Sequence, residues 1–150
     1  MKSNRGFSLI EIMVVIGIIA ILATIAVPNI IGWRTKQRFL AAASDVHEAI
    51  KMARSAAIKD NTTVVIQFQL NRFTVFADDD ADGSQDAGER TIFSSNFLND
   101  IALTTSFPGH RLSFNGRGLT NAVGDGITLS NAVYGTRVLQ VTVTGNSRML

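Results

Sequence analysis

One stretch of the chain concentrates carboxylates at a spacing that suits a metal ion. Residues 78–89 read DDDADGSQDAGE, which matches the D-x-D-x-D-G-x5-E spacing of loops that surround Ca²⁺ with oxygen atoms. The candidate ligands are Asp78, Asp80, Asp82, Ser84 through its carbonyl, Asp86 directly or through water, and Glu89 through both oxygens. The flanking residues are typical of strands, so an EF-hand domain is not predicted. The alternative is a solvated acidic turn that keeps a hairpin tip soluble.

The other reactive side chains argue against an enzyme. The sequence has no cysteine, which excludes a thiol nucleophile, a disulfide framework and a zinc–thiolate site. Its two histidines, His47 and His110, lie far apart in the sequence without a third partner motif. We therefore expect a non-enzymatic protein without a small-molecule substrate, and Ca²⁺ is the one cofactor that the sequence indicates.

A further carboxylate, Glu11, lies next to a long apolar run. Residues 12–27 read IMVVIGIIAILATIAV, in which Thr24 is the one polar side chain. As a helix, the run from Phe7 to Val27 would extend about 31 Å, close to the roughly 30 Å of a bilayer's hydrocarbon core. An acid at the bilayer centre costs roughly 2.5–3.5 kcal/mol. A cleaved secretory signal or a generic membrane anchor would explain the apolar run but not this glutamate.

Glu11 ends the string Arg5-Gly6-Phe7-Ser8-Leu9-Ile10-Glu11. This string resembles the class III leader of type IV pilins and type II secretion pseudopilins. The resemblance implies that a prepilin peptidase cuts after Gly6 on the cytoplasmic side, and that the new terminal amine of Phe7 is N-methylated. It also implies that Glu11 pairs with the N-terminal amine of a neighbouring subunit during filament assembly.

The resemblance gives Glu11 and Pro28 functions in assembly. Desolvation offsets much of the attraction within a buried ion pair, so we interpret Glu11 as a register device: subunits adopt the stagger that pairs its charge. Pro28 removes the helical hydrogen bond to the carbonyl of Thr24. The resemblance implies a flexible or locally unwound point there, and the alternative is a plain kink at the membrane exit.

Beyond the apolar run, the periodicity predicts the remaining elements. Apolar residues recur at helical spacings of three and four at Phe39, Ala43, Val46, Ile50, Ala53 and Ala57. Alternating patterns then predict short strands at residues 62–69, 72–77, 90–94, 102–106, 111–114, 127–129 and 137–144. The predicted fold is α+β, with a long N-terminal transmembrane and assembly helix packed on a small antiparallel β-sheet head.

The predicted head carries two further motifs, Asp86-Ala-Gly-Glu89 and Phe114-Asn-Gly-Arg-Gly118. They resemble the GspH/FimT branch of minor pilins, and this resemblance implies a subunit at or near a filament tip that primes assembly. Some FimT-type members bind DNA through a C-terminal G-R-x-R motif. The corresponding stretch here is Gly145-Asn146-Ser147-Arg148, in which Asn146 replaces the first arginine and Arg148 is the one arginine kept. The alternative function is therefore DNA binding through Arg148 for uptake in natural transformation, with phosphate contacts from Arg111, Arg117 and Arg137.

The resemblance and the residue patterns predict three segments. Residues 1–6 are a cleaved leader, residues 7–60 a helix that spans the membrane over residues 7–27, and residues 61–150 an extracytoplasmic β head. The expected location is the bacterial inner membrane, in a single pass with a cytoplasmic N-terminus and a periplasmic head, and afterwards the pilus or pseudopilus. The expected partners are other pilins or pseudopilins, prepilin peptidase and inner-membrane lipid.

Overall fold

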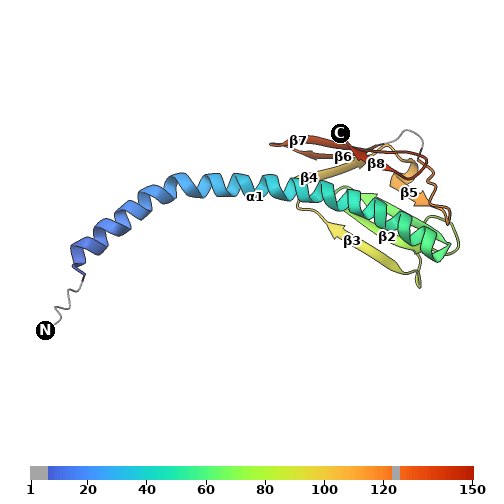
Figure 1. Ribbon diagram of the computed structural model, residues 1–150, viewed down its shortest axis with the longest axis horizontal. Helices are drawn as coiled ribbons and strands as arrows, with labels where there is room; N and C mark the ends of the chain where they lie inside the picture. The colour runs from blue at the N-terminus through green and yellow to red at the C-terminus, as the bar shows by residue number, and fades with distance from the viewer. Residues whose placement is uncertain (1–6, 123–125) are drawn as a thin grey trace. The chain divides into compact units, whose positions relative to one another are not determined.

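The computed structural model describes residues 7–122 and 126–150 of the chain. These residues form one long helix, a set of short strands and a 3-10 turn (Figure 1). The chain divides into two compact units, Met1–Arg38 and Phe39–Leu150. Helix α1 (Leu9–Asp60) contributes residues to both of them.

The described part of the first unit is helical from Leu9 onward. The helix begins where the amides of Glu11 and Ile12 donate to the carbonyl of Ser8, at 3.1 and 3.3 Å. Pro28 lies inside α1, and the helix continues through it. The described helix is therefore not unwound at Pro28, although proline supplies no amide donor there. A flexible point that acts during assembly stays a prediction.

The second unit contains all of the buried apolar residues that belong to α1. They are Phe39, Ala42, Ala43, Val46, Ala49, Ile50, Ala53 and Ala57. The predicted stripe is confirmed, and Ala42 and Ala49 widen it. Five of these eight residues are alanines, and such small side chains let neighbouring strands approach the helix closely. All of these residues except Ala43 belong to the same core cluster as buried residues from both sheets, including Ile66, Phe114 and Leu129.

The first sheet has the strand order β3-β2-β1-β5, and each neighbouring pair is antiparallel. Its strands are β1 (Thr63–Gln69), β2 (Arg72–Asp78), β3 (Thr91–Asn96) and β5 (Arg111–Phe114). Strands β1 and β2 form a hairpin closed by the pair Gln69 and Arg72, which agrees with the two-residue gap between the predicted strands 62–69 and 72–77. The acidic residues 78–89 begin at the last residue of β2 and continue into the connection to β3.

The second sheet has the order β4-β6-β7-β8 and is also antiparallel. Its strands are β4 (Ile101–Thr105), β6 (Gly126–Asn131), β7 (Gly135–Val141) and β8 (Ser147–Met149). The 3-10 helix η1 (Pro108–His110) lies between β4 and β5 in the sequence. Core residues from this sheet, Leu103, Ile127 and Leu139, belong to the same cluster as the helix stripe.

The structure corrects two details of the predicted head. The sequence predicts a single small sheet, whereas the described residues form two four-stranded sheets. The last predicted strand, 137–144, ends earlier, at Val141. A tight turn follows, in which the amide of Gly145 donates to the carbonyl of Thr142 at 2.7 Å. Beyond it, the unpredicted strand β8 pairs with β7, and Val143 is half exposed because it lies in this turn.

Candidate functional site

The first candidate site is the N-terminal end of α1, which carries the residues predicted to act in assembly. Phe7 is 80% exposed, and Glu11 lies exposed in the first turn of the helix. A carboxylate in the first turn is favoured by the helix dipole, whose positive end lies there. Gly6, the predicted cleavage residue, and the rest of the leader at residues 1–6 lie outside the described residues.

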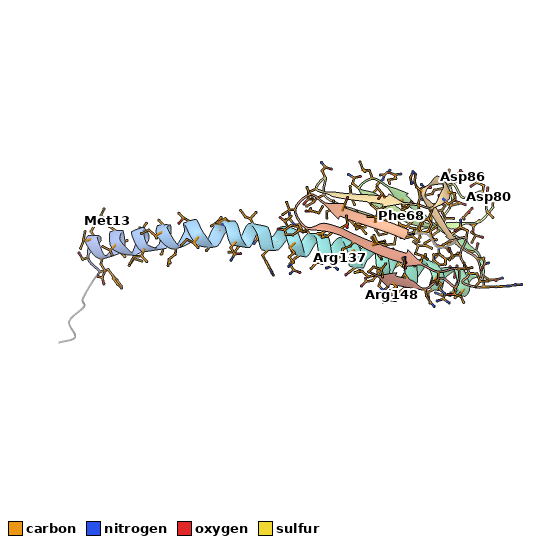
Figure 2. All side chains as sticks on the ribbon, turned by 90° about the horizontal axis from the view of Figure 1, so that it is seen from above. Met13, Phe68, Asp80, Asp86, Arg137 and Arg148 are labelled. Atoms are coloured by element: carbon orange, nitrogen blue, oxygen red, sulfur yellow. The ribbon has the colours of Figure 1, made fainter. Side chains whose placement is uncertain are left out.

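The apolar side chains that follow Glu11 face outward rather than into a core. Large exposed apolar residues of this unit include Ile12, Met13, Val15, Ile16, Ile19, Leu22 and Ile25, and Figure 2 labels Met13 among them. Among the described residues, α1 is the one helix long and apolar enough to cross a membrane. An apolar surface of this extent is typical of a segment that contacts lipid or other helices.

The second candidate site is the acidic loop between β2 and β3. Asp78 is the last residue of β2 and is buried, whereas Asp80 and Asp82 are exposed. One carboxylate oxygen from each of these three aspartates lies within 4.8 Å of the other two. Figure 2 shows Asp80 and Asp86 at the same end of the second unit. The structure therefore gathers three of the six predicted ligands.

The fold uses Glu89 to close the acidic loop. Its Oε1 accepts a hydrogen bond from the amide of Asp79 at 3.0 Å, and its Oε2 accepts one from the amide of Asp86 at 2.9 Å. Each carboxylate oxygen thus holds one end of the loop. Ser84, whose carbonyl is a predicted ligand, donates its amide to Oδ1 of Asp82 at 2.6 Å.

The third candidate site surrounds the C-terminal tail near Arg148. Arg148 lies exposed on β8, where it pairs with Gln140 of β7. In Figure 2 it lies apart from the acidic loop marked by Asp80 and Asp86. Arg137 and Arg117 are also exposed. In contrast, Arg111 donates from Nε to Oε1 of Gln67 at 2.6 Å and is partly buried.

Next to the tail, the structure shows a basic groove that the motif comparison does not predict. The groove has a volume of about 700 Å³ and is lined by Lys51, Arg54, Ser55, Ile58, Lys59, Gly145, Asn146 and Ser147. Arg54 donates from Nη1 to Oδ1 of Asn146 at 3.0 Å. Lys51, Arg54 and Lys59 lie close together in the sequence of α1, but only the β7–β8 turn brings residues 145–147 next to them.

Both histidines make hydrogen bonds within the fold. Nδ1 of His47 and Oγ of Ser147 are 2.8 Å apart, which joins α1 to β8. Nδ1 of His110 and Oγ1 of Thr105 are 3.3 Å apart. His47 is partly exposed.

Comparisons with known proteins match both parts of the sequence. Residues 42–147 match the family described as type II transport protein GspH, and residues 1–27 match the prokaryotic N-terminal methylation motif. The chain is 40% identical over 65 residues to a fimbrial protein of Pseudomonas aeruginosa, covering 43% of this chain and 42% of that protein. It is 52% identical over 43 residues to the type II secretion system core protein G of Escherichia coli strain K12, covering 29% and 30%. The chain thus spans less than half the length of these relatives.

Solved structures share the fold at low sequence identity. The minor pilin FimU of Pseudomonas aeruginosa strain PAO1 aligns with a TM-score of 0.64 and 16% identity, covering 79% of this chain and 92% of that one. The minor pseudopilin EpsH from the type 2 secretion system of Vibrio cholerae aligns with a TM-score of 0.56 and 12% identity, covering 73% and 94%. The GspH match over residues 42–147 shows that the chain belongs to the type II transport protein GspH family, and it shares its fold with the minor pilin FimU and the minor pseudopilin EpsH.

Proposed function

We propose that this chain is a structural subunit of a type IV pilus or a type II secretion pseudopilus, and that it assembles with other pilins through the N-terminal part of α1. The observation that carries the proposal is the exposed apolar surface of residues 12–27, which follows one acid in the first helical turn. Such a surface has to be covered by lipid or by neighbouring helices. The function is mechanical rather than catalytic.

The proposed assembly step uses the charge of Glu11. Cleavage after Gly6 frees a cationic amine on Phe7, and Glu11 of one subunit pairs with the amine of its neighbour. An unpaired charge in an apolar bundle is strongly unfavourable, whereas the paired state gains little net stability. The pair therefore selects the stagger between subunits more than it adds to their affinity.

Before assembly, residues 7–27 would hold the chain in the inner membrane. In this proposal the leader, residues 1–6, lies in the cytoplasm, where prepilin peptidase removes it, and the head, residues 61–150, lies in the periplasm. Pro28 marks the place where the helix leaves the bilayer. Mass spectrometry of the chain purified from its native membrane tests the processing step. A mature terminus at methylated Phe7 supports it, and an intact terminus at Met1 contradicts it.

The function of Glu11 is tested by replacing it in cells that make the filament. The Glu11→Ala variant should stay in the membrane fraction, and its amount in sheared filaments should fall at least tenfold, because the Phe7 amine loses its partner. Glu48→Ala is the matched control, since it removes one exposed carboxylate from the same helix within the second unit. The assembly step would be contradicted if Glu11→Ala entered filaments in the same amount and at the same position as the wild-type chain.

A second candidate function is DNA binding, which the basic groove favours. Lys51, Arg54 and Lys59 line this groove beside the tail that carries Arg148, and neutralised phosphates supply most non-specific affinity for DNA. A gel shift with the full chain in non-ionic detergent tests it. If the chain binds DNA, the shift should weaken steeply as the salt concentration rises. At one salt concentration it should be weaker for Arg148→Ala than for the wild type, and Arg137→Ala should have a smaller effect. No shift at low salt would exclude it.

A further inference from the structure

We propose that the acidic loop of residues 78–89 binds a Ca²⁺ ion through the carboxylates of Asp78, Asp80 and Asp82. This site is independent of the N-terminal segment that carries the proposed assembly function. All three ligands belong to the second unit. The proposal rests on two separate features of the loop: the convergence of three carboxylates and a buried oxygen without a partner.

The convergence comes from the spacing of the loop. One oxygen from each of Asp78, Asp80 and Asp82 lies within 4.8 Å of the other two, so three negative charges occupy a volume suited to one cation. At such separations like charges repel appreciably even in water. A divalent cation at the centre would replace this repulsion with attraction.

The second feature is the environment of Asp78. This residue is 2% exposed. Its Oδ2 accepts a hydrogen bond from the amide of Gly83 at 3.0 Å, whereas its Oδ1 is buried and accepts no hydrogen bond from the described residues. A buried carboxylate oxygen without a partner is costly. Burial, with a smaller contribution from the charge of Glu89, raises the pKa of Asp78 above its ordinary value of 3.8. A bound cation would supply the missing partner.

The remaining hydrogen bonds orient the three carboxylates. Oδ1 of Asp80 accepts from the amide of Asp82 at 3.2 Å, and Oδ1 of Asp82 accepts from the amide of Ser84 at 2.6 Å. As in Asp78, one oxygen of each carboxylate is fixed by the backbone, which leaves the second oxygen for a cation. Glu89, whose two oxygens hold the amides of Asp79 and Asp86, is a positioning residue that closes the loop.

The ligand chemistry favours Ca²⁺ over other cations. Oxygen ligands alone suit hard cations, and Ca²⁺ accepts six to eight of them in flexible geometry. Because Asp80 and Asp82 are exposed, water can complete the shell. A cage of three carboxylates with water ligands is expected to bind in the range of about 10⁻⁴–10⁻³ M, as extracellular calcium modules do. Arg111 lines the same cavity of about 240 Å³ as Asp78 and Asp82. Its positive charge is the alternative to a bound Ca²⁺ ion for balancing these carboxylates.

The test uses the full chain in non-ionic detergent, stripped with EDTA and dialysed. Isothermal titration with CaCl₂ and with MgCl₂, together with thermal unfolding, is measured for four proteins: wild type, Asp78→Asn, the double variant Asp80→Asn/Asp82→Asn, and the control Glu48→Gln. The double variant changes exposed side chains only, so it keeps the proposal testable if Asp78→Asn does not fold. Glu48→Gln removes one exposed carboxylate outside the loop.

We expect one Ca²⁺ per chain and a rise of several degrees in the unfolding temperature at ten times Kd. Mg²⁺ should bind at least tenfold more weakly, and the double variant should lose at least tenfold in Ca²⁺ affinity while Glu48→Gln retains it. The proposal would be overturned if titration with CaCl₂ released or absorbed no heat and the unfolding temperature did not change at a Ca²⁺ concentration ten times the upper end of the expected Kd range. Arg111 would then be left as the charge that balances the carboxylates. Equal Ca²⁺ binding in the double variant would overturn it as well.

Discussion

The side chains of His47 and Ser147 form a hydrogen bond that joins α1 to the last strand of the head. His47 and Ser147 lie 100 positions apart in the sequence, and their side chains are 2.8 Å apart in the fold. The amphipathic pattern of α1 predicts that His47 lies beside the buried stripe. It cannot predict Ser147 as the partner, because strand β8 has only three residues and no alternating pattern of its own.

We expect Ser147→Ala to lower the free energy of unfolding by about 0.5–1.5 kcal/mol, since it removes one partner of a partly buried hydrogen bond. Chemical unfolding of the full chain in detergent, followed by far-UV circular dichroism, measures the change. Ser44→Ala is the control, because Ser44 is exposed on the same helix. A loss of equal size in Ser44→Ala would show that the effect comes from serine replacement in general and not from the contact with His47.

Among the elements, the helix and the first hairpin were predictable, whereas the division into two sheets was not. The stripe on α1 and the pairing of β1 with β2 follow from local patterns of residues such as Val46 and Phe73, which the fold buries. The second sheet depends on pairing between β4 and β6, for example Leu103 with Leu129. Such pairs are distant in the sequence, and no periodicity within either strand identifies the partner strand.

The β7–β8 turn depends on the backbone freedom of Gly145. Its φ is +75°, and an added Cβ would lie 2.7 Å from the carbonyl oxygen of Gly118. We expect Gly145→Ala to destabilise the head by more than the roughly 1–2 kcal/mol that a left-handed conformation alone costs. Gly135 also has a positive φ, +79°, but open space around it, so Gly135→Ala measures the conformational cost alone. Thermal unfolding that gives both variants the same loss would disprove the close approach to Gly118.

At the scale of the whole molecule, the two units differ in how far their residues are buried. None of the described residues before Phe39 is buried, whereas the core cluster begins at Phe39 and includes both sheets. The candidate sites follow the same division. The assembly residues and the spacing of the acidic loop could be read from local sequence. The basic groove could not, because residues 51–59 and 145–147 meet only in the folded head.

This division predicts that the chain shortened to residues 39–150 folds without the N-terminal segment. Its core residues, from Phe39 to Val141, are all retained, so it should stay in solution without detergent and unfold cooperatively. Its unfolding temperature should lie within a few degrees of that of the full chain in detergent, because none of the described residues that are removed is itself buried. Size-exclusion chromatography and calorimetry measure both properties. Aggregation of residues 39–150, or a gradual transition without a heat-absorption peak, would mean that residues 7–38 stabilise the head, and the two units would then have to be treated as one cooperative structure.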